Sequence, residues 1–178
     1  MNATTKLHST LVEPGTVRLE RLLPGPIERV WAYLTESEKR AKWFAGGEWE
    51  LRVGGRAELQ FDHASLSNDK VPPEKYKDKG KPSPTFAGRI TGVEPMRMVA
   101  HTMMFDGGET EVTYELTPRG RDVLLTIVHR NLSKVRVAGI MGGWDVHTGI
   151  LADVLNGVEP RPFWTTHARL EKEYGATL

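Results

Sequence analysis

The chain has 178 residues and no cysteine, and its 24 Lys and Arg against 23 Asp and Glu leave a formal net charge of +1. A single domain of this length buries roughly 70% of the surface of its unfolded chain, so it needs neither disulfides nor a structural metal. The balanced charge argues against a dedicated nucleic-acid binder, which would carry a basic patch. Since there is no signal peptide and no run of about 18 apolar residues, we expect a cytoplasmic protein without membrane insertion.

The first quarter of the chain predicts a tail, a strand and two short helices. Residues 1–15 are polar and show no periodicity, so we expect a flexible tail. Apolar residues alternate with charged ones over residues 16–21, which predicts a strand. Residues 26–35 begin with a proline, which suits the first position of a helix, and continue with apolar residues at helical spacing. A second helix is expected over residues 37–44.

The middle of the chain predicts strands around one long loop. Alternation over residues 48–61, interrupted by a Gly-Gly turn, predicts a β-hairpin. Residues 62–84 contain four prolines, and five lysines interspersed with acidic residues, which indicates an exposed mixed-charge loop rather than an anion-binding patch. Four further strands are expected over residues 85–93, 97–105, 109–117 and 121–132. The short turns between them imply an antiparallel meander.

The last third of the chain is helical in pattern. Apolar residues at steps of three and four predict a helix with one apolar face over residues 134–156. The interior of this predicted helix contains Gly139, Gly142, Gly143 and Gly149. Each glycine lowers the stability of a helix by about 1 kcal/mol relative to alanine. Two explanations stay open, namely close packing against a curved sheet and space left for a ligand. A short terminal helix is expected over residues 163–174.

Five stretches of the sequence carry a joint pattern. They are LPGPIERVWAYLTESEKRAKWF (23–44), VGGRAELQF (53–61), FAGRITGVEPMRMVAHT (86–102), TEVTYELTPRGRDVLLTIVHRNL (110–132) and GGWDVHTGILADVLNG (142–157). Together they resemble the START-like (SRPBCC) superfamily, in the branch of homologues of the activator of the heat-shock-protein-ninety ATPase. The resemblance spans most of residues 16–157.

This resemblance implies an α+β helix-grip (START-like) fold. In that fold a curved antiparallel sheet wraps around a long C-terminal helix, and two short helices follow the first strand. Residues 16–157 would form the domain, with residues 62–84 as its exposed loop, and residues 158–178 would be a C-terminal extension with a short helix. Relatives bind lipids, hormones or polyketides, some catalyse cyclisation or hydrolysis of a bound ligand, and one branch regulates a chaperone. The implied common feature is an apolar cavity between the sheet and the helix.

Strand alternation and helical spacing select the side chains that would line such a cavity. The inward strand faces would carry His101, Met103, Tyr114, Ile127 and His129, and the long helix would add Ile140, Trp144, His147 and Leu151. Trp31 and Phe44 would lie near the entrance, and Phe61 and Phe86 complete the candidate ligand-binding set. A mostly apolar pocket with a few polar groups is the usual form of a small-molecule site.

Each histidine has a structural and a catalytic interpretation. A structural histidine hydrogen-bonds a neighbour, whereas an unperturbed pKa of about 6.5 would suit a general acid or base. The sequence fixes no carboxylate partner, because Asp145 and Asp153 are two and six residues from His147 and neither step places them beside it. The sequence shows no metal-ligand pattern and no phosphate-binding glycine-rich loop, so we expect no metal and no cofactor.

The leading hypothesis is binding of an apolar small molecule, such as a lipid or polyketide, between the sheet and the C-terminal helix. One alternative is a protein-interaction module that regulates a chaperone ATPase. Another is a cyclase or hydrolase that acts on a cavity-bound ligand through His101 or His129, although a binder is favoured over an enzyme. The expected partners are therefore an apolar ligand or a chaperone, with the chain as a monomer or homodimer.

Overall fold

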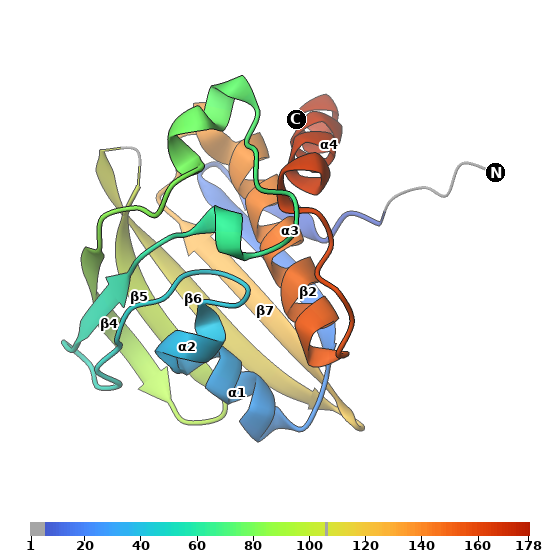
Figure 1. The fold of residues 1–178 in the computed structure, drawn as a ribbon. Helices are drawn as coiled ribbons and strands as arrows, with labels where there is room; N and C mark the ends of the chain where they lie inside the picture. The colour runs from blue at the N-terminus through green and yellow to red at the C-terminus, as the bar shows by residue number, and fades with distance from the viewer. Residues whose placement is uncertain (1–5, 106) are drawn as a thin grey trace.

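A curved antiparallel sheet wraps around one long helix in the computed structural model of the chain, which describes residues 6–105 and 107–178 (Figure 1). The strands are β1 (Ser9–Glu13), β2 (Thr16–Pro24), β3 (Arg56–Leu59), β4 (Phe86–Glu94), β5 (Met98–Phe105), β6 (Gly108–Arg119) and β7 (Asp122–Arg130). Over the described residues they form one seven-stranded sheet in the order β1-β2-β7-β6-β5-β4-β3. The meander predicted from the short turns is present as β4 to β7.

Helices occupy the concave side of the sheet (Figure 1). They are α1 (Ile27–Thr35), α2 (Ser37–Arg40), α3 (Val137–Leu155) and α4 (Phe163–Thr177), with short 3-10 turns η1 (His63–Ser65), η2 (Glu74–Lys79) and η3 (Lys134–Arg136). The sheet curves around α3, α4 packs against α3, and the segment that carries η1 and η2 crosses over α3. The predicted α+β helix-grip fold is therefore confirmed.

The strand register places the predicted inner faces in one continuous surface. Ile127 of β7 is opposite Leu19 of β2 on one side and Tyr114 of β6 on the other. His129 is likewise paired with Val112 of β6. Directly paired residues share a face of the sheet, and all five of these side chains are buried. The alternation read from the sequence thus correctly assigns the side of the sheet that faces α3.

The predicted tail is wrong in part, because residues 9–13 form β1. This strand pairs with β2, where Ser9 is opposite Leu19 and Leu11 is opposite Val17. Its side chains are mostly exposed, so no apolar alternation marks it in the sequence. Backbone hydrogen bonds to the edge of β2 hold it instead. Residues 1–5 lie outside the described part of the chain.

The predicted hairpin over residues 48–61 is present only as irregular antiparallel pairing. Only residues 56–59 form a strand, β3, and this strand pairs with β4. The stretch before it runs antiparallel to it through two isolated bridges, Trp49 to Ala57 and Gly46 to Gln60. Backbone hydrogen bonds join the same stretches, for example from the Glu58 N–H to the Glu48 carbonyl, at 3.0 Å. Leu51 and Val53 are exposed, so the alternation there buries no second face. The helix predicted over residues 37–44 ends early, at Arg40.

The segment over residues 62–84 is less exposed than predicted. Its lysines are exposed, but Leu66 and Ser67 are buried. The Ser67 hydroxyl accepts a hydrogen bond from the backbone N–H of Phe163, at 3.0 Å, and Asp69 accepts two from Thr165. This segment is therefore attached to the start of α4, a contact with a partner almost a hundred residues away in the sequence.

Candidate functional site

Rings from several strands, helices and loops meet between the sheet and α3. Phe44, after α2, lies 5.0 Å from Trp144 of α3 and 5.1 Å from Phe61, measured between ring centroids. Trp144 lies 5.9 Å from Tyr114, and Tyr114 stacks on His101 at 5.6 Å. We call this group the interior aromatic cluster, and its members are Phe44, Trp49, Phe61, His101, Tyr114, His129, Trp144 and His147.

The cluster contains more than half of the predicted ligand-binding residues. Phe44, Phe61, His101, Tyr114, His129, Trp144 and His147 come together in it. Met103, Ile127, Ile140 and Leu151 are buried in the hydrophobic core that surrounds it. Trp31 is buried on α1 and has no ring contact with the described residues of the cluster, and Phe86 is 42% exposed at the start of β4. Their roles as ligand contacts stay predictions.

His101 and Tyr114 form one polar pair inside the cluster. The Nδ1 atom of His101 lies 3.0 Å from the Thr102 carbonyl oxygen, which can only accept, so Nδ1 carries the proton in the neutral ring. The Tyr114 hydroxyl then donates to Nε2 of His101, at 3.2 Å. Trp49 covers His101 at 4.8 Å between ring centroids. Both side chains are fully buried, so this pair gives the apolar interior a fixed polar point.

His129 lies in a chain of hydrogen bonds. The indole Nε1–H of Trp144 donates to Nδ1 of His129, at 3.1 Å. The Nε2–H of His129 donates to the Thr110 hydroxyl, at 2.9 Å, and that hydroxyl donates to the Met103 carbonyl, at 3.1 Å. Every proton has a defined place, because an indole only donates and a carbonyl only accepts. Both nitrogens of His129 are therefore occupied.

His147 differs, because one of its nitrogens is unused. Its Nδ1–H donates to the Trp43 carbonyl, at 2.7 Å. Its Nε2 is then an acceptor, and it has no hydrogen-bond partner among the described residues. The ring of His63 lies 5.6 Å away, and neither nitrogen of His63 has such a partner in the described part of the chain either. Unused polar atoms therefore gather where η1 meets α3.

The glycines of α3 divide between the two explanations left open by the sequence. A Cβ added at Gly142 would lie 3.1 Å from the Glu171 backbone nitrogen, and one at Gly149 would lie 2.6 Å from the Arg161 guanidinium. These positions serve close packing, but against α4 and the segment before it rather than against the sheet. A Cβ at Gly143 would meet nothing within 4 Å. Gly143 therefore borders open space, one helical turn before His147.

Burial keeps the cluster histidines neutral. It lowers the pKa of His101 to about 4 and the pKa of His129 to about 3, and it lowers the pKa of His147 to about 3. The two acidic residues considered near His147 have other partners. Asp145 pairs with Arg21 at 2.6 Å, and Asp153 pairs with Arg161 at 2.7 Å. Neutral histidines without carboxylate partners act here as hydrogen-bonding groups.

Arg40 is a buried cation that the sequence interpretation did not single out. Its Nε–H donates to the Ala45 carbonyl at 3.0 Å, and its other nitrogens donate to the carbonyls of Leu34, Thr35 and Gly47. The guanidinium carbon lies 3.9 Å from the ring centroid of Trp49. Burial lowers the pKa of Arg40 to about 10, so it stays charged at neutral pH. Arg40 thereby fixes the loop that presents Phe44 and Trp49 to the interior.

Other residues of the site were also missed. Thr110 is the first inward residue of β6 and completes the His129 chain, and alternation from Val112 and Tyr114 would have found it. His63 has no comparable signal, because it lies in an irregular segment. Arg40 reads as one more charged residue on a short helix, and only its carbonyl partners reveal it.

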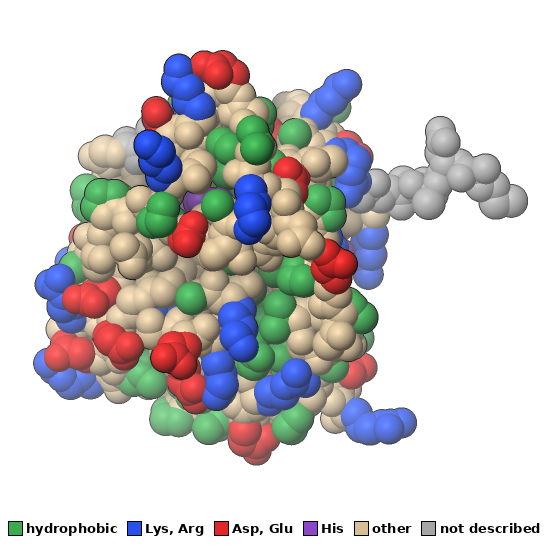
Figure 2. Space-filling view, in the orientation of Figure 1, with side chains coloured by type: hydrophobic (Ala, Val, Ile, Leu, Met, Phe, Trp, Pro, Cys, Tyr) green, Lys and Arg blue, Asp and Glu red, His purple; other side chains and the backbone are tan. Residues whose placement is uncertain are grey.

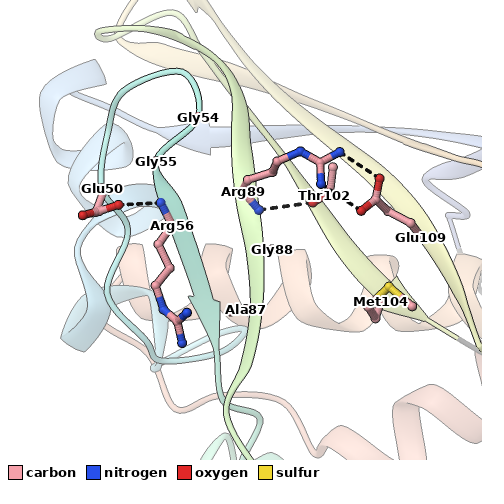
Figure 3. Close-up of a pocket in the computed structure, with 10 residues that line it drawn as sticks. All are labelled: Glu50, Gly54, Gly55, Arg56, Ala87, Gly88, Arg89, Thr102, Met104 and Glu109. Atoms are coloured by element: carbon pink, nitrogen blue, oxygen red, sulfur yellow. Dashed lines mark hydrogen bonds and ion pairs between the residues drawn. The ribbon is translucent and has the colours of Figure 1, made fainter.

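The hollows found on the surface lie away from the cluster. One of about 420 Å³ lies on the outer face of β3 to β5, and Figure 3 shows Arg89 and Glu109 directed toward one another beside it. Their two hydrogen bonds measure 3.0 and 3.1 Å. A second hollow, of about 350 Å³, lies between Asn68, Asp69 and the segment before α4. The charged side chains that line the first one are paired, Arg89 with Glu109, Arg56 with Glu58 and Glu50 with Arg52.

The described residues hold no group of three or more His, Asp or Glu side chains that could bind a metal ion. No helix among them is long and apolar enough to cross a membrane. On the face in view, Figure 2 shows Lys and Arg interspersed with Asp and Glu. The surface in view thus has no single-sign patch of the kind that nucleic-acid binding requires.

Comparison with known proteins gives matches to a family and to solved structures. Residues 24–156 match the family described as Activator of Hsp90 ATPase homolog 1-like protein. A Bordetella parapertussis protein with a solution NMR structure is 37% identical, with a TM-score of 0.80 over 97% of this chain and 91% of that one. CalU16 of Micromonospora echinospora is 19% identical, with a TM-score of 0.68 over 90% of this chain and 86% of its own. DynU16, described as a putative protein in the dynemicin biosynthetic locus, is 21% identical, with a TM-score of 0.60 over 85% of this chain and 51% of its own. No curated protein matches the sequence.

Proposed function

Since the chain belongs to the family of Activator of Hsp90 ATPase homolog 1-like proteins, within the START-like superfamily, we propose that it binds an apolar small molecule between the sheet and α3. The observation that carries the proposal is the interior aromatic cluster, in which fixed polar atoms stand among apolar rings. Such a combination is typical of ligand sites. DynU16, which has the same fold, is described as belonging to a biosynthetic locus, and this agrees with a small-molecule partner.

The cluster favours a flat, ring-bearing ligand. Its walls are indole, phenyl and imidazole faces, which contact planar molecules by stacked or edge-on packing. His147 adds one constraint, since its free Nε2 accepts hydrogen bonds and its lowered pKa keeps it unprotonated. A ligand with a hydroxyl or N–H group on an apolar ring system would satisfy both features.

Ligand entry requires side chains to move, because the cluster rings are in contact. Phe61 and His63 are the natural candidates, since both are only partly buried. Phe61 comes directly before the segment over residues 62–84, and His63 lies at its start. Their rings stack on one another at 5.7 Å. Rotation of this pair would open a path toward Phe44 and His147 beside the open space at Gly143.

The first test is native mass spectrometry of the purified chain, compared with the same sample after denaturation. A small molecule that leaves on unfolding would identify the chemical class of the ligand. Thermal stabilisation by a panel of hydroxylated aromatic compounds and lipids would extend the test to weak ligands. Neither a retained mass nor any stabilisation across the panel would contradict the proposal.

A variant pair locates the site. Trp144→Phe removes the indole that touches Phe44, Tyr114 and His129, and we expect it to weaken binding of a panel ligand by about tenfold. Tyr33→Leu removes a ring of α1 that is outside the predicted ligand-binding set and has no ring contact with the described cluster residues, and it should leave the dissociation constant within about twofold. Equal effects of the two substitutions on affinity would place the ligand elsewhere.

The description of the family favours a second candidate function, regulation of a chaperone ATPase. This activity would use the outer surface and would not require the cluster. An assay of Hsp90 ATPase turnover with the chain added separates the two functions, because stimulation that survives Trp144→Phe would support the chaperone role alone.

The third hypothesis, a cyclase or hydrolase, gains no support from His101 or His129, since all their ring nitrogens are occupied.

A further inference from the structure

A second group of rings adjoins the interior aromatic cluster where η2 meets α4, and Phe163 joins the two groups, 5.0 Å from His147. Tyr76 of η2 stacks on Trp164 at 5.8 Å and meets His167 edge-on at 5.2 Å. Phe163 stacks on His167 at 6.0 Å, and His63 lies 5.4 Å from Trp164. The helix that supplies Phe163, Trp164 and His167 follows the stretch that matches the family, which ends at residue 156.

Two of these rings leave a buried polar atom without a partner. They are Nε1 of Trp164 and Nδ1 of His167, and neither has a hydrogen bond to any described residue. Trp164 is 4% exposed and His167 is 6% exposed. Buried polar atoms are nearly always paired, so two unpaired ones three residues apart on one helix need an explanation.

The chemistry of the two atoms is complementary. An indole Nε1–H can only donate. His167 donates its Nε2–H to the Gly139 carbonyl, at 3.0 Å, and burial lowers its pKa, so in the neutral ring Nδ1 is an acceptor. A group that satisfies both atoms must accept one hydrogen bond and donate another. A hydroxyl does so, whereas a carboxylate cannot donate to His167 and an ammonium cannot accept from Trp164.

The face of α3 beside this ring group is filled at Gly139 and open at Gly143. Gly139, whose carbonyl holds His167, faces the Tyr76 hydroxyl, and a Cβ added there would lie 3.2 Å from that oxygen. Gly143 is one helical turn further on the same face, and a Cβ there would meet nothing within 4 Å. Open space therefore adjoins the ring group on the α3 side.

We propose that Trp164 and His167 form a second binding site, beside the interior aromatic cluster, for the hydroxyl group of a neutral phenol or alcohol. The hydroxyl oxygen accepts from the Trp164 indole, its proton is donated to Nδ1 of His167, and the apolar part of the molecule extends toward Gly143. A site built to hydrogen-bond a hydroxyl rejects the same molecule without it. Its two hydrogen-bonding atoms belong to α4 and not to the interior aromatic cluster.

The test follows the indole N–H signals of the whole chain by two-dimensional NMR during titration with phenol or toluene. Trp164→Phe assigns the Trp164 signal by its loss. Phenol should shift that signal saturably, and toluene, which has the same ring without the hydroxyl, should bind at least about tenfold more weakly by this readout. A response of Trp144 without a response of Trp164 would support the interior site and refute this one.

Two variants separate recognition from folding. His167→Phe removes the acceptor but keeps Trp164 as the reporter, and we expect about tenfold weaker phenol binding. Gly143→Ala places a methyl group in the open space and should weaken phenol binding at least about threefold. Its matched control is Gly175→Ala, near the end of α4, where an added Cβ also meets nothing within 4 Å. If phenol does not move the Trp164 signal, an ordered water alone satisfies the Trp164 and His167 nitrogens. If phenol and toluene shift the signal equally, the hydroxyl is not recognised. Either result overturns the proposal.

Discussion

Gly142 and Gly143 are neighbours on α3 and should respond in opposite ways to the same added methyl group. Alanine is better than glycine in a helix interior by about 1 kcal/mol. At Gly143 the new Cβ meets nothing within 4 Å, so Gly143→Ala should keep this gain in full. For a chain of this size, about 1 kcal/mol raises Tm by roughly 2–4 °C.

At Gly142 the same Cβ would lie 3.1 Å from the Glu171 nitrogen and 3.4 Å from its Cα. Both are backbone atoms of α4, so they cannot rotate away, and α4 must shift as a unit with its buried Leu170. Overpacking of this kind costs about 1–3 kcal/mol. After the propensity gain is subtracted, Gly142→Ala should be about 1 kcal/mol less stable than the parent chain.

Urea unfolding of the parent and both variants measures these differences directly. The slope of the free energy of unfolding against urea should stay constant, and only the midpoint should move. The two variants should differ by about 2 kcal/mol. If Gly142→Ala is stabilised as much as Gly143→Ala, α4 does not pack on α3 as described, and the reasoning about the space beside Gly143 fails with it.

Three further predictions concern buried charge and buried histidines. Histidines of the unfolded chain titrate near pH 6.5, whereas burial lowers the pKa of His101 to about 4 and of His129 and His147 to about 3. Below pH 6.5 the unfolded chain therefore binds more protons than the folded one. The free energy of unfolding should fall as the pH drops from 6.5 to 4, by about 1.4 kcal/mol per pH unit for each histidine. His129→Gln should reduce that slope by one proton in urea unfolding at several pH values, and an unchanged slope would show that His129 titrates normally in the folded state. Asp145→Asn leaves the buried Arg21 without its anion and should lower the free energy of unfolding by about 3–5 kcal/mol. Glu20→Gln, in the exposed pair with Arg18, should lower it by less than about 1 kcal/mol. Similar losses of stability in the two variants would mean that the Arg21 pair is solvated. Arg40→Lys should lower the free energy of unfolding by about 2 kcal/mol or more, because one ammonium group cannot reach the four carbonyls that the guanidinium binds. The surface substitution Arg52→Lys should change it by less than about 0.5 kcal/mol. Equal effects of the two substitutions would contradict the structural role given to Arg40.

The sequence alone was sufficient where the signal is local and periodic. The strands β4 to β7 are joined by short turns, so alternation assigned His101, Tyr114 and His129 to one face of the sheet. The 3.6-residue period likewise placed Trp144 and His147 on the inner side of α3. These side chains meet because side-chain direction is fixed by the repeat of each element once the sheet curves around the helix.

The tertiary structure decided what depends on contacts between distant segments. Arg21 and Asp145 are 124 residues apart, and Asp69 reaches Thr165 across 96 residues. The local sequence around Arg40 does not reveal its four carbonyl partners. The sequences around His63 and Trp164 likewise do not reveal that their ring nitrogens lack hydrogen-bond partners among the described residues. The sequence therefore determined the curved sheet, the central helix and the inward histidines, because those follow from periodicity. The partners of the buried charges, the packing of α4 and the unpaired atoms of Trp164 and His167 were decided only when the segments packed, because a hydrogen bond depends on positions that no single segment specifies.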